Sequence, residues 1–400
     1  MLARRLILPA LLSATTLGTV SAVALVAWRI IHPARSRLTQ ILDVFSDGRI
    51  VLESTPMTRQ DGKLGLLYDG EAQHAVLGPI LNSDLEKKIE RAFVLTPGSP
   101  VPVAGTSARP VGNVFATAEA VSADVREVII ETACGDAPAW LFPGTDDDAS
   151  TWAIHIHGSL SGREGAFRTV NSLKSAGVTS LVPSIRGDGD GPPAPRGAFT
   201  LGQTEWHDID NAVDYAVNHG AHRILLVGWS SGASMALRLA ASSKHRDIID
   251  GLILISPVIS WRNSIMHNSA HFGVPGVIAI AAVDALAFKP TSRLFGLSQP
   301  LQFPQLDWLL NKPALLPMLI FHSEGDRTAP FRDSDRFATI ARRSVELMRL
   351  PSTGHALEWN FDSAAFEQKV TEWLPEVQRQ RGADFKPEFD TRAGQSDSES

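Results

Sequence analysis

Gly228-Trp229-Ser230-Ser231-Gly232 is the stretch that decides the fold expected for this chain. The apolar run Ile224–Val227 precedes it, and residues 233–241, rich in Ala, Leu and Met, follow it. This order predicts a strand, a sharp turn and a helix. The pattern G-x-S-x-G in that setting is a nucleophile elbow, whose strained turn holds the serine hydroxyl above the carboxyl edge of a sheet. We expect side chains at either glycine to collide with the strand or the helix.

Predicted strands and helices alternate from residue 127 onward. Strands are expected at 127–132, 139–142, 152–156, 178–185, 224–227, 249–255, 317–321 and 345–350, and helices at 163–176, at 204–219 and around the apolar face of Phe366, Val370, Trp373 and Leu374. This alternation predicts an α/β fold with a mostly parallel sheet covered by helices on both faces. Residues 260–312 interrupt the alternation between two strands, so we expect an insertion there.

From residue 38 onward the chain divides into three regions. Residues 38–126 contain short β-prone runs separated by Asp-Gly turn signals, which predict a small β-rich accessory region without a chemical motif. Within it, residues 97–110 are rich in Pro, Gly and Ser, which indicates a loop or linker. Residues 127–381 form the expected main domain, and the polar stretch 382–400 is predicted to be disordered.

The amino-terminal residues 1–37 contain a long apolar run. No charged side chain occurs over the 23 residues Leu6–Trp28, which as a helix would span about 34 Å, enough to cross a hydrocarbon core of about 30 Å. We therefore expect an uncleaved transmembrane signal anchor that holds the protein at a membrane. The alternative is a cleaved signal ending near Ala22-Val23-Ala24 and a secreted protein. Arginines flank both ends of the run, so the side of the membrane stays undetermined.

Charge and cysteine content exclude several classes of function. The net charge is −6, and because residues 1–37 hold five arginines and no acid, the remaining 32 basic and 43 acidic residues give −11. An acidic body argues against nucleic acid as a partner. The single cysteine, Cys134, excludes an intrachain disulfide and a cysteine-based metal site, and we expect an inert thiol there.

Two further residues complete a predicted catalytic constellation with Ser230. A serine hydroxyl needs a base, and the base needs an orienting carboxylate. Asp326 follows the predicted strand 317–321 and His355 follows the strand 345–350, so both should lie on the same sheet edge as Ser230. Their order, Ser then Asp then His, is the one expected after a nucleophile elbow. For the oxyanion we expect the backbone amides of Ser231 and Ser159.

Other polar residues near these positions offer weaker alternatives. Glu324 is a rival to Asp326 for the acid. His155 and His157 share one strand face, but no third metal ligand is suitably spaced. The stretch 188–191 resembles a calcium loop, yet the later ligands are missing. We therefore expect neither a metal nor a cofactor.

These motifs together resemble the α/β-hydrolase superfamily, in its serine esterase and lipase branch. The matching pieces lie between about residues 127 and 375: His157-Gly158, Arg186-Gly187-Asp188-Gly189, Gly228 to Gly232, Asp326-x-x-x-Pro330 and Gly354-His355. The resemblance implies the α/β-hydrolase fold, a triad of Ser230, Asp326 and His355, and a cap over the substrate pocket at 260–312. The sequence departs from the hormone-sensitive-lipase relatives, because His157-Gly158-Ser159 lacks their triple glycine.

The function expected from these observations is hydrolysis of carboxylic esters, including lipid or acyl esters, through an acyl-enzyme. One alternative is a serine peptidase of the oligopeptidase type, although 126 residues are too few for the large propeller of those enzymes. The other is a non-catalytic envelope protein on a hydrolase scaffold. The natural substrate and the oligomeric state do not follow from the sequence.

Overall fold

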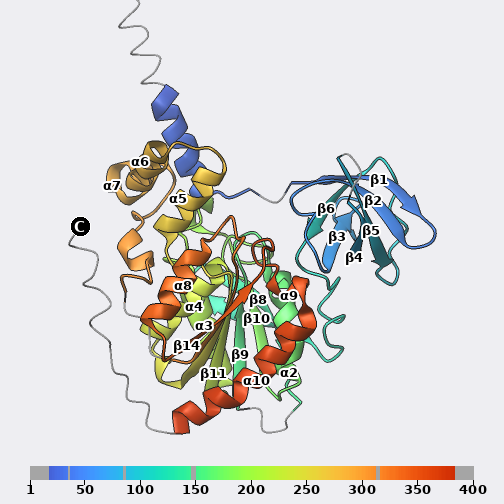
Figure 1. The fold of residues 1–400 in the computed structure, drawn as a ribbon. Coiled ribbons are helices and arrows are strands. Elements are labelled where there is room, and N and C mark those ends of the chain that lie inside the picture. The colour runs from blue at the N-terminus through green and yellow to red at the C-terminus, as the bar shows by residue number, and fades with distance from the viewer. Residues whose placement is uncertain (1–17, 35–36, 84–86, 146–149, 312–315, 383–400) are drawn as a thin grey trace, which may run out of the picture.

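Two separate β-structures organise the chain (Figure 1). The structure is a computed structural model, and it describes residues 18–34, 37–83, 87–145, 150–311 and 316–382. A six-stranded closed barrel occupies the amino-terminal part of this chain, and an eight-stranded sheet occupies the remainder. Helices surround the sheet, whereas the barrel stands beside it at one side of the molecule (Figure 1).

The eight-stranded sheet is mostly parallel, as predicted. Its strands are β7 (Arg126–Thr132), β8 (Gly135–Phe142), β9 (Thr151–Ile156), β10 (Thr179–Pro183), β11 (Arg223–Trp229), β12 (Ile249–Ile255), β13 (Met318–Ser323) and β14 (Val345–Leu350). They are arranged in the order β14-β13-β12-β11-β9-β10-β8-β7, and only β8 runs against its neighbours. All seven residues of β12 are buried, which fits a strand that is covered on both faces.

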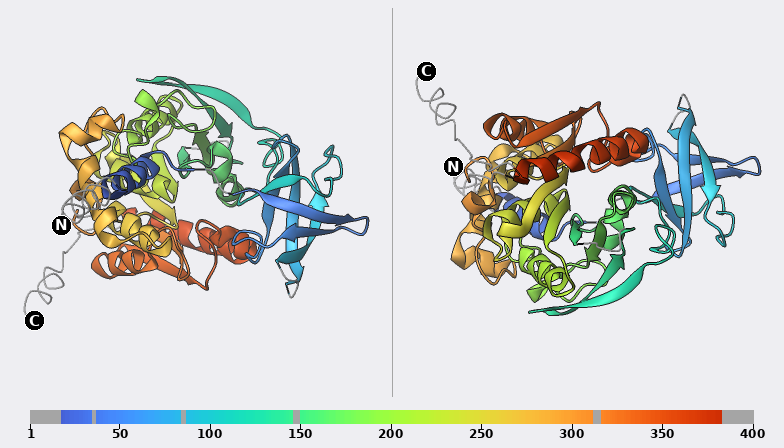
Figure 2. Two further views of the ribbon diagram at one scale, coloured as in Figure 1. Left: turned by 90° about the horizontal axis from the view of Figure 1, so that it is seen from above. Right: turned by 90° about the horizontal axis from the view of Figure 1, so that it is seen from below.

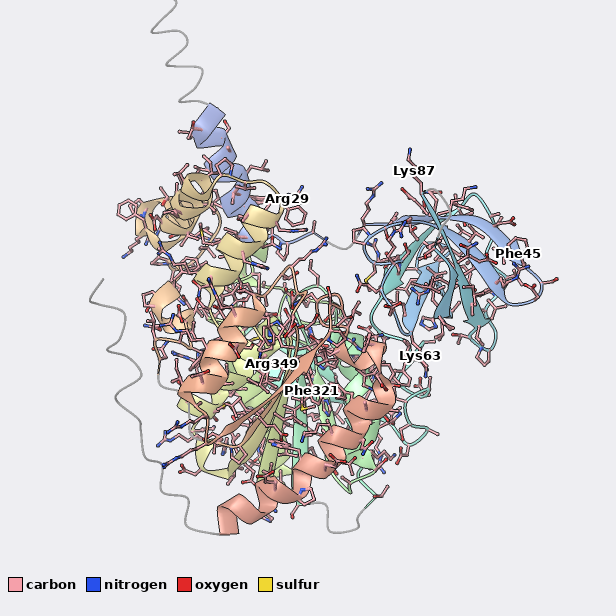
Figure 3. The ribbon with its side chains drawn as sticks, in the orientation of Figure 1. Arg29, Phe45, Lys63, Lys87, Phe321 and Arg349 are labelled. Atoms are coloured by element: carbon pink, nitrogen blue, oxygen red, sulfur yellow. The ribbon has the colours of Figure 1, made fainter. Side chains whose placement is uncertain are left out.

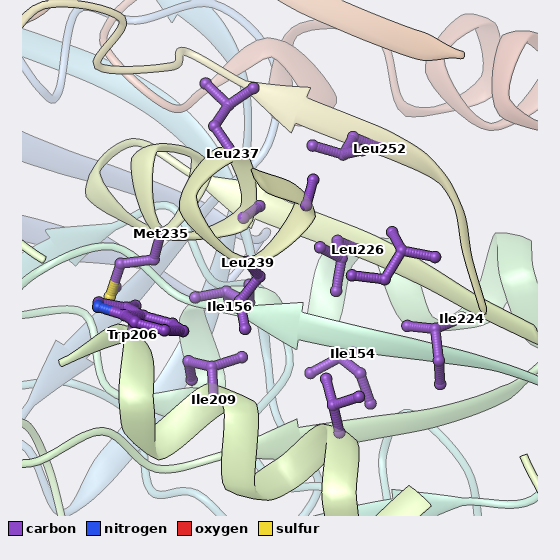
Figure 4. Close-up of a cluster of buried hydrophobic side chains, with 14 of the residues drawn as sticks. Ile154, Ile156, Trp206, Ile209, Ile224, Leu226, Met235, Leu237, Leu239 and Leu252 are labelled. Carbon is purple, nitrogen blue, oxygen red and sulfur yellow. The ribbon is translucent and has the colours of Figure 1, made fainter. Parts of the chain in front are cut away.

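Helices cover both faces of this sheet. On one face, α3 (Trp206–Asn218), α4 (Ser231–Ser242) and α8 (Phe331–Ile340) contribute to one core cluster. Figure 4 shows part of this cluster, in which Trp206 of α3 lies next to Met235 of α4. On the other face lie η1 (Arg163–Thr169), α2 (Val170–Lys174) and α10 (Ser363–Gly382). The four predicted inner-face residues of α10, Phe366, Val370, Trp373 and Leu374, are buried, so that prediction is confirmed.

The helix expected at 163–176 is instead a 3₁₀ segment, η1, followed by the short helix α2. Gly165 lies within the 3₁₀ segment, and glycine is a poor former of regular helix. The remaining helix, expected at 204–219, agrees with α3 to within two residues.

The predicted β-rich accessory region is confirmed as a closed barrel. Its strands are β1 (Thr39–Phe45), β2 (Arg49–Glu53), β3 (Leu64–Tyr68), β4 (Gln73–Asn82), β5 (Lys88–Leu95) and β6 (Ser107–Val111), in the order β1-β2-β5-β4-β3-β6. The barrel closes through an antiparallel pairing of β1 with β6, which removes the free edges. Part of the stretch expected to be a loop, residues 107–110, therefore pairs as a strand.

The insertion between β12 and β13 is helical. It contains α5 (Trp261–His271), α6 (Gly276–Ala287), α7 (Lys289–Leu294) and the 3₁₀ segment η4 (Phe303–Leu306). These helices lie beyond the carboxyl ends of the strands, on the same side of the sheet as the loops that follow β11, β13 and β14 (Figure 1).

The expected transmembrane anchor is wrong. No helix in the part of the chain that the structure describes is long and apolar enough to cross a bilayer. Residues 18–31 are helical, which at about 1.5 Å per residue spans about 21 Å, and residues 6–17 of the predicted span lie outside the described residues. The described helix lies beside the insertion in Figures 1 and 2, and its Ala27 and Ile31 are fully buried in a cluster with Val283. The predicted membrane localisation depended on that anchor and is corrected with it.

The predicted disordered tail lies almost entirely outside the described residues, since the structure describes the chain only to residue 382.

Candidate active site

The nucleophile elbow has the geometry that its sequence predicts. Ser230 lies between β11 and α4 with φ 52° and ψ −113°, a backbone region that residues other than glycine rarely occupy. A Cβ at Gly228 would lie 2.5 Å from the Ala233 Cα, within the following helix. A Cβ at Gly232 would lie 2.2 Å from the Ile156 carbonyl oxygen, at the end of the neighbouring strand. Both glycines are therefore required for the close approach of strand and helix that holds Ser230.

The structure brings the other two predicted residues to Ser230. His355 Nε2 lies 2.7 Å from Ser230 Oγ, and His355 Nδ1 lies 2.6 Å from Asp326 Oδ2. Both distances are within direct proton-transfer and hydrogen-bonding reach. The three residues follow the carboxyl ends of β11, β13 and β14, which meet at one edge of the sheet. The rival acid, Glu324, is exposed to solvent, and it is Asp326 that contacts His355.

Asp326 is held on both of its carboxylate oxygens. Its side chain is fully buried, and Oδ1 accepts hydrogen bonds from the amides of Thr328 (2.7 Å) and Ala329 (3.0 Å). Oδ2 accepts from His355 and lies 3.2 Å from His322 Nε2. Burial alone would oppose ionisation, but the His355 and His322 imidazoles outweigh it and hold the pKa of Asp326 below its usual range. Asp326 therefore stays a carboxylate that fixes the imidazole ring.

The pKa of His355 shifts in the opposite direction to that of Asp326. Burial would lower its pKa, but the Asp326 carboxylate outweighs that effect and raises the pKa above the usual histidine value, with a smaller contribution from Glu358. The side chain is 21% exposed, so solvent and a substrate can reach it. The raised pKa means that Asp326 stabilises the protonated form of His355.

Sequence reasoning missed His322, a second histidine that contacts Asp326. It lies at the end of β13, fully buried, and its Nε2 faces two acceptors, Asp326 Oδ2 and the Ala329 carbonyl oxygen, each at 3.2 Å. Nε2 therefore donates toward these acceptors, and Nδ1 forms a hydrogen bond with the Ser334 hydroxyl at 2.7 Å. The sequence signal that could have identified His322 is its position on a buried strand, four residues before Asp326.

Glu358 was also missed. It is fully buried, its Oε1 accepts from the Ser256 hydroxyl and from the Ser323 amide (3.3 Å), and burial raises its pKa. The Ser256 hydroxyl oxygen in turn accepts the Ala356 amide at 3.0 Å, directly after His355. Glu358 thus supports the backbone next to the base, and no sequence motif marks it.

The two predicted oxyanion donors are in contact with each other. The Ser159 amide donates to Ser231 Oγ at 2.8 Å, and Ser231 is the first residue of α4. The first amides of a helix have no acceptor within the helix, so the Ser231 amide is available to a ligand. For the Ser159 amide to serve an oxyanion as well, the Ser231 hydroxyl has to turn away from it.

Metal-ligating side chains do not gather around this site. Within the described ranges, no group of three or more His, Cys, Asp or Glu side chains is arranged to hold a metal ion. His155 is fully buried between the hydroxyls of Thr169 and Ser180, both at 2.9 Å, and burial lowers its pKa to about 3. Its two ring nitrogens are both occupied, so its role is structural.

Comparison with known proteins finds two family models in this chain. Residues 141–368 match the model of the alpha/beta hydrolase family, a match that covers more than half of the chain. Residues 40–110, which form the barrel, match a domain of unknown function (DUF8805).

Individual relatives are distant. The uncharacterized protein YfhR of Salmonella typhimurium is 23% identical over 233 residues, which cover 54% of this chain and 69% of YfhR. Among solved structures, the esterase Pf2001 of Pyrococcus furiosus superposes with a TM-score of 0.50 at 21% identity, covering 65% of this chain and 94% of the esterase. At that identity the likeness shows a shared fold.

Proposed function

Because this chain belongs to the alpha/beta hydrolase family, we propose that it is a serine hydrolase that cleaves carboxylic esters through Ser230, His355 and Asp326. The observation that carries the proposal is the continuous contact from Ser230 Oγ through His355 to Asp326, at 2.7 Å and 2.6 Å. In this proposal residues 127–381 form the catalytic unit and the insertion at 260–312 forms the cap over the substrate site. Contacts of α5 with the acid loop support that placement, since His267 Nε2 lies 3.0 Å from the Asp326 carbonyl oxygen.

The proposed reaction proceeds in two halves. His355 Nε2 takes the proton of Ser230 as the serine oxygen attacks the ester carbonyl, and the amides of Ser231 and Ser159 bind the resulting oxyanion. The tetrahedral intermediate collapses, the alcohol leaves with the proton from His355, and the acyl group stays on Ser230. His355 then deprotonates a water molecule, which attacks the acyl-enzyme. As the bond between the Ser230 oxygen and the acyl carbon breaks, His355 returns the proton to Ser230 and the carboxylic acid is released.

Several observations favour an ester substrate over the alternatives. One structural neighbour is named an esterase, and the accessory region is a six-stranded barrel, unlike the propeller of oligopeptidases. The intact contacts between the three residues argue against a non-catalytic scaffold. In the apolar stretch 274–288, the buried residues Val283 and Leu286 pack in a cluster with Ile31, which favours a packing role for this stretch over an acyl-chain pocket.

The test is the Ser230→Ala variant assayed on short aryl esters. We expect kcat to fall by about 10⁴-fold or more, since the nucleophile is lost. Ser242→Ala, an exposed serine on the same helix α4, is the matched control and should keep the wild-type rate. A fluorophosphonate probe should label the wild type and the control but not Ser230→Ala. Turnover by Ser230→Ala at the wild-type rate would refute the proposal.

A substrate panel then separates the alternatives within the proposal. We expect turnover of esters and none of matched peptide amides. Rates that rise with acyl-chain length would indicate lipid esters, whereas rates without such a rise would remove the lipase assignment.

A further inference from the structure

The barrel contacts the segment that carries the catalytic histidine. We call residues 354–361 the histidine loop. Leu357, two residues after His355, is 2% exposed and packs inside the barrel's hydrophobic cluster rather than within the catalytic unit's own core. Asn360 Nδ2 donates to the carbonyl oxygens of Lys63 and Gly112, both at 2.7 Å, and the Lys63 amide donates back to the Asn360 carbonyl at 3.0 Å. The histidine loop is therefore attached to the barrel by an apolar anchor and by a polar one.

Arg91 fixes the part of the barrel that makes these contacts. Its fully buried guanidinium donates to the carbonyl oxygens of Thr58 (2.9 Å), Gln60 (2.6 Å) and Gly62 (2.6 Å), and also to that of Gly78. Burial lowers the pKa of Arg91 to about 10. The planar fork of an arginine makes such contacts only in a defined geometry. Arg91 thus sets the shape of residues 54–63, which end at Lys63 on the side of the barrel nearest the larger sheet (Figure 3).

The histidine loop is strained and is held from its other side as well. Ala356 has φ 57°, a left-handed conformation that is unfavourable for a residue with a Cβ. Such strain persists only where the surroundings enforce it. Arg168 Nη1 donates to the Ala356 carbonyl oxygen at 2.7 Å and also to Asn360 Oδ1, while its guanidinium lies 3.9 Å from the Trp229 ring, next to Ser230. The barrel and Arg168 therefore meet at Asn360.

We propose that the barrel positions the catalytic histidine, and that Asn360 is the positioning residue through which it acts. The inference rests on the proposed function of Ser230 and His355. It assigns residues 38–126 a role in catalysis without placing any of their side chains on the substrate. Loss of the barrel contact should let the strained histidine loop relax and move His355 away from Ser230 and Asp326.

A matched pair of glycine variants tests this without substituting any residue of the catalytic unit. A Cβ at Gly62 would lie 1.9 Å from the Asn360 carbonyl oxygen, and φ there is +83°, so Gly62→Ala has to displace the histidine loop. Gly48 has nearly the same φ, +84°, but its Cβ would make only an ordinary 3.5 Å contact with the Phe93 carbonyl oxygen inside the barrel. Gly48→Ala therefore reproduces the backbone strain of Gly62→Ala without the contact.

We expect Gly62→Ala to lower kcat, and the rate of fluorophosphonate labelling, by about tenfold or more with KM within about twofold, since small misplacements of reacting groups are costly. Gly48→Ala should stay within about twofold of wild type in kcat. The acid limb of the Gly62→Ala pH profile should move to lower pH, because a looser contact with Asp326 raises the His355 pKa less. Of the other titratable groups nearby, Glu358 lies in the histidine loop and should move with His355, whereas His322 lies on β13, outside that loop.

Equal kcat values for the two glycine variants would overturn the inference, and so would a loss confined to KM. If Gly62→Ala does not fold, the Asn360→Asp variant tests the inference instead. Aspartate keeps the oxygen that accepts from Arg168, but it cannot donate to the carbonyl oxygens of Lys63 and Gly112. A tenfold fall in its kcat supports the positioning role, and an unchanged kcat refutes it. Ser230→Ala measured alongside separates the two proposals, because its inactivity upholds the proposed function whatever the glycine variants do.

Discussion

At the scale of single residues, the contacts around Asp326 explain how a buried carboxylate stays charged. Two amides bind one oxygen and two imidazoles face the other. Hydrogen bonds to the charged form offset the loss of hydration that burial causes. The negative charge in turn favours the protonated form of His355, which is the form that the proposed reaction creates when Ser230 loses its proton.

Asp326→Asn tests this arrangement. Because an amide can donate a hydrogen bond to Nδ1 and leave the wrong imidazole tautomer facing Ser230, we expect kcat to fall by about 10⁴-fold. Glu324→Gln, which neutralises the exposed rival acid, should keep the wild-type kcat. The opposite pattern, a loss in Glu324→Gln alone, would assign the acid role to Glu324.

The same pair of residues sets the expected pH dependence. The base has to be neutral, and the pKa of His355 is raised above its usual value of about 6.5, so kcat/KM of the wild type should rise with pH and reach half its maximum above about pH 6.5. Charged His355 also stabilises the fold. That contribution is complete below about pH 6.5 and is lost as the pH rises through the folded-state pKa. Under the proposed function, activity is therefore expected to be highest where this stabilisation has been lost.

At the scale of elements, the close packing of α4 on β9 and β11 builds the site. Gly232→Ala would place a methyl group 2.2 Å from the Ile156 carbonyl oxygen, directly before the segment 157–159 that carries a predicted oxyanion donor. We expect a loss of about 1–3 kcal/mol in the free energy of unfolding and slower labelling by a fluorophosphonate probe. Gly276→Ala is the control, since that glycine begins helix α6 and its Cβ would meet only Met266 at 3.7 Å. Equal unfolding free energies for the two variants would contradict the steric explanation.

Elements with strong local signals were predictable from the sequence, and those decided by tertiary contacts were not. Apolar runs such as 249–255 and the Asp-Gly turns at Gly48 and Gly70 appear where expected, because buried strands and left-handed turns restrict the residue types that they accept. Strand β6 lies in a stretch with many turn-forming residues and forms because β1 and β3 pair with it. Glu358 depends on Ser256, which is distant in sequence, and no local pattern reveals that contact, whereas the spacing of His322 from Asp326 is a local signal.

At the scale of the whole molecule, tertiary contacts that a local pattern does not reveal also explain why the predicted amino-terminal anchor is wrong. A long apolar run satisfies a length criterion for crossing a bilayer, but that criterion ignores apolar surface elsewhere in the chain. Here α6, in the insertion, is also rich in apolar residues and packs with the amino-terminal helix in one cluster. The Phe199 amide donates to the Ile31 carbonyl oxygen at 2.9 Å, so a backbone hydrogen bond also joins the amino-terminal helix to the segment before α3.

This packing makes a prediction about stability. Ile31 lies at the end of the amino-terminal helix and is fully buried in the cluster that this helix forms with the insertion. Ile31→Ala should therefore lower the free energy of unfolding by about 2–4 kcal/mol, because apolar burial is lost and a cavity is left behind. Leu25 lies on the same helix and is 60% exposed, so Leu25→Ala should cost less than about 0.5 kcal/mol. Urea unfolding of the full chain measures both values. Equal losses, or none in Ile31→Ala, would mean that this helix does not pack on the insertion in solution.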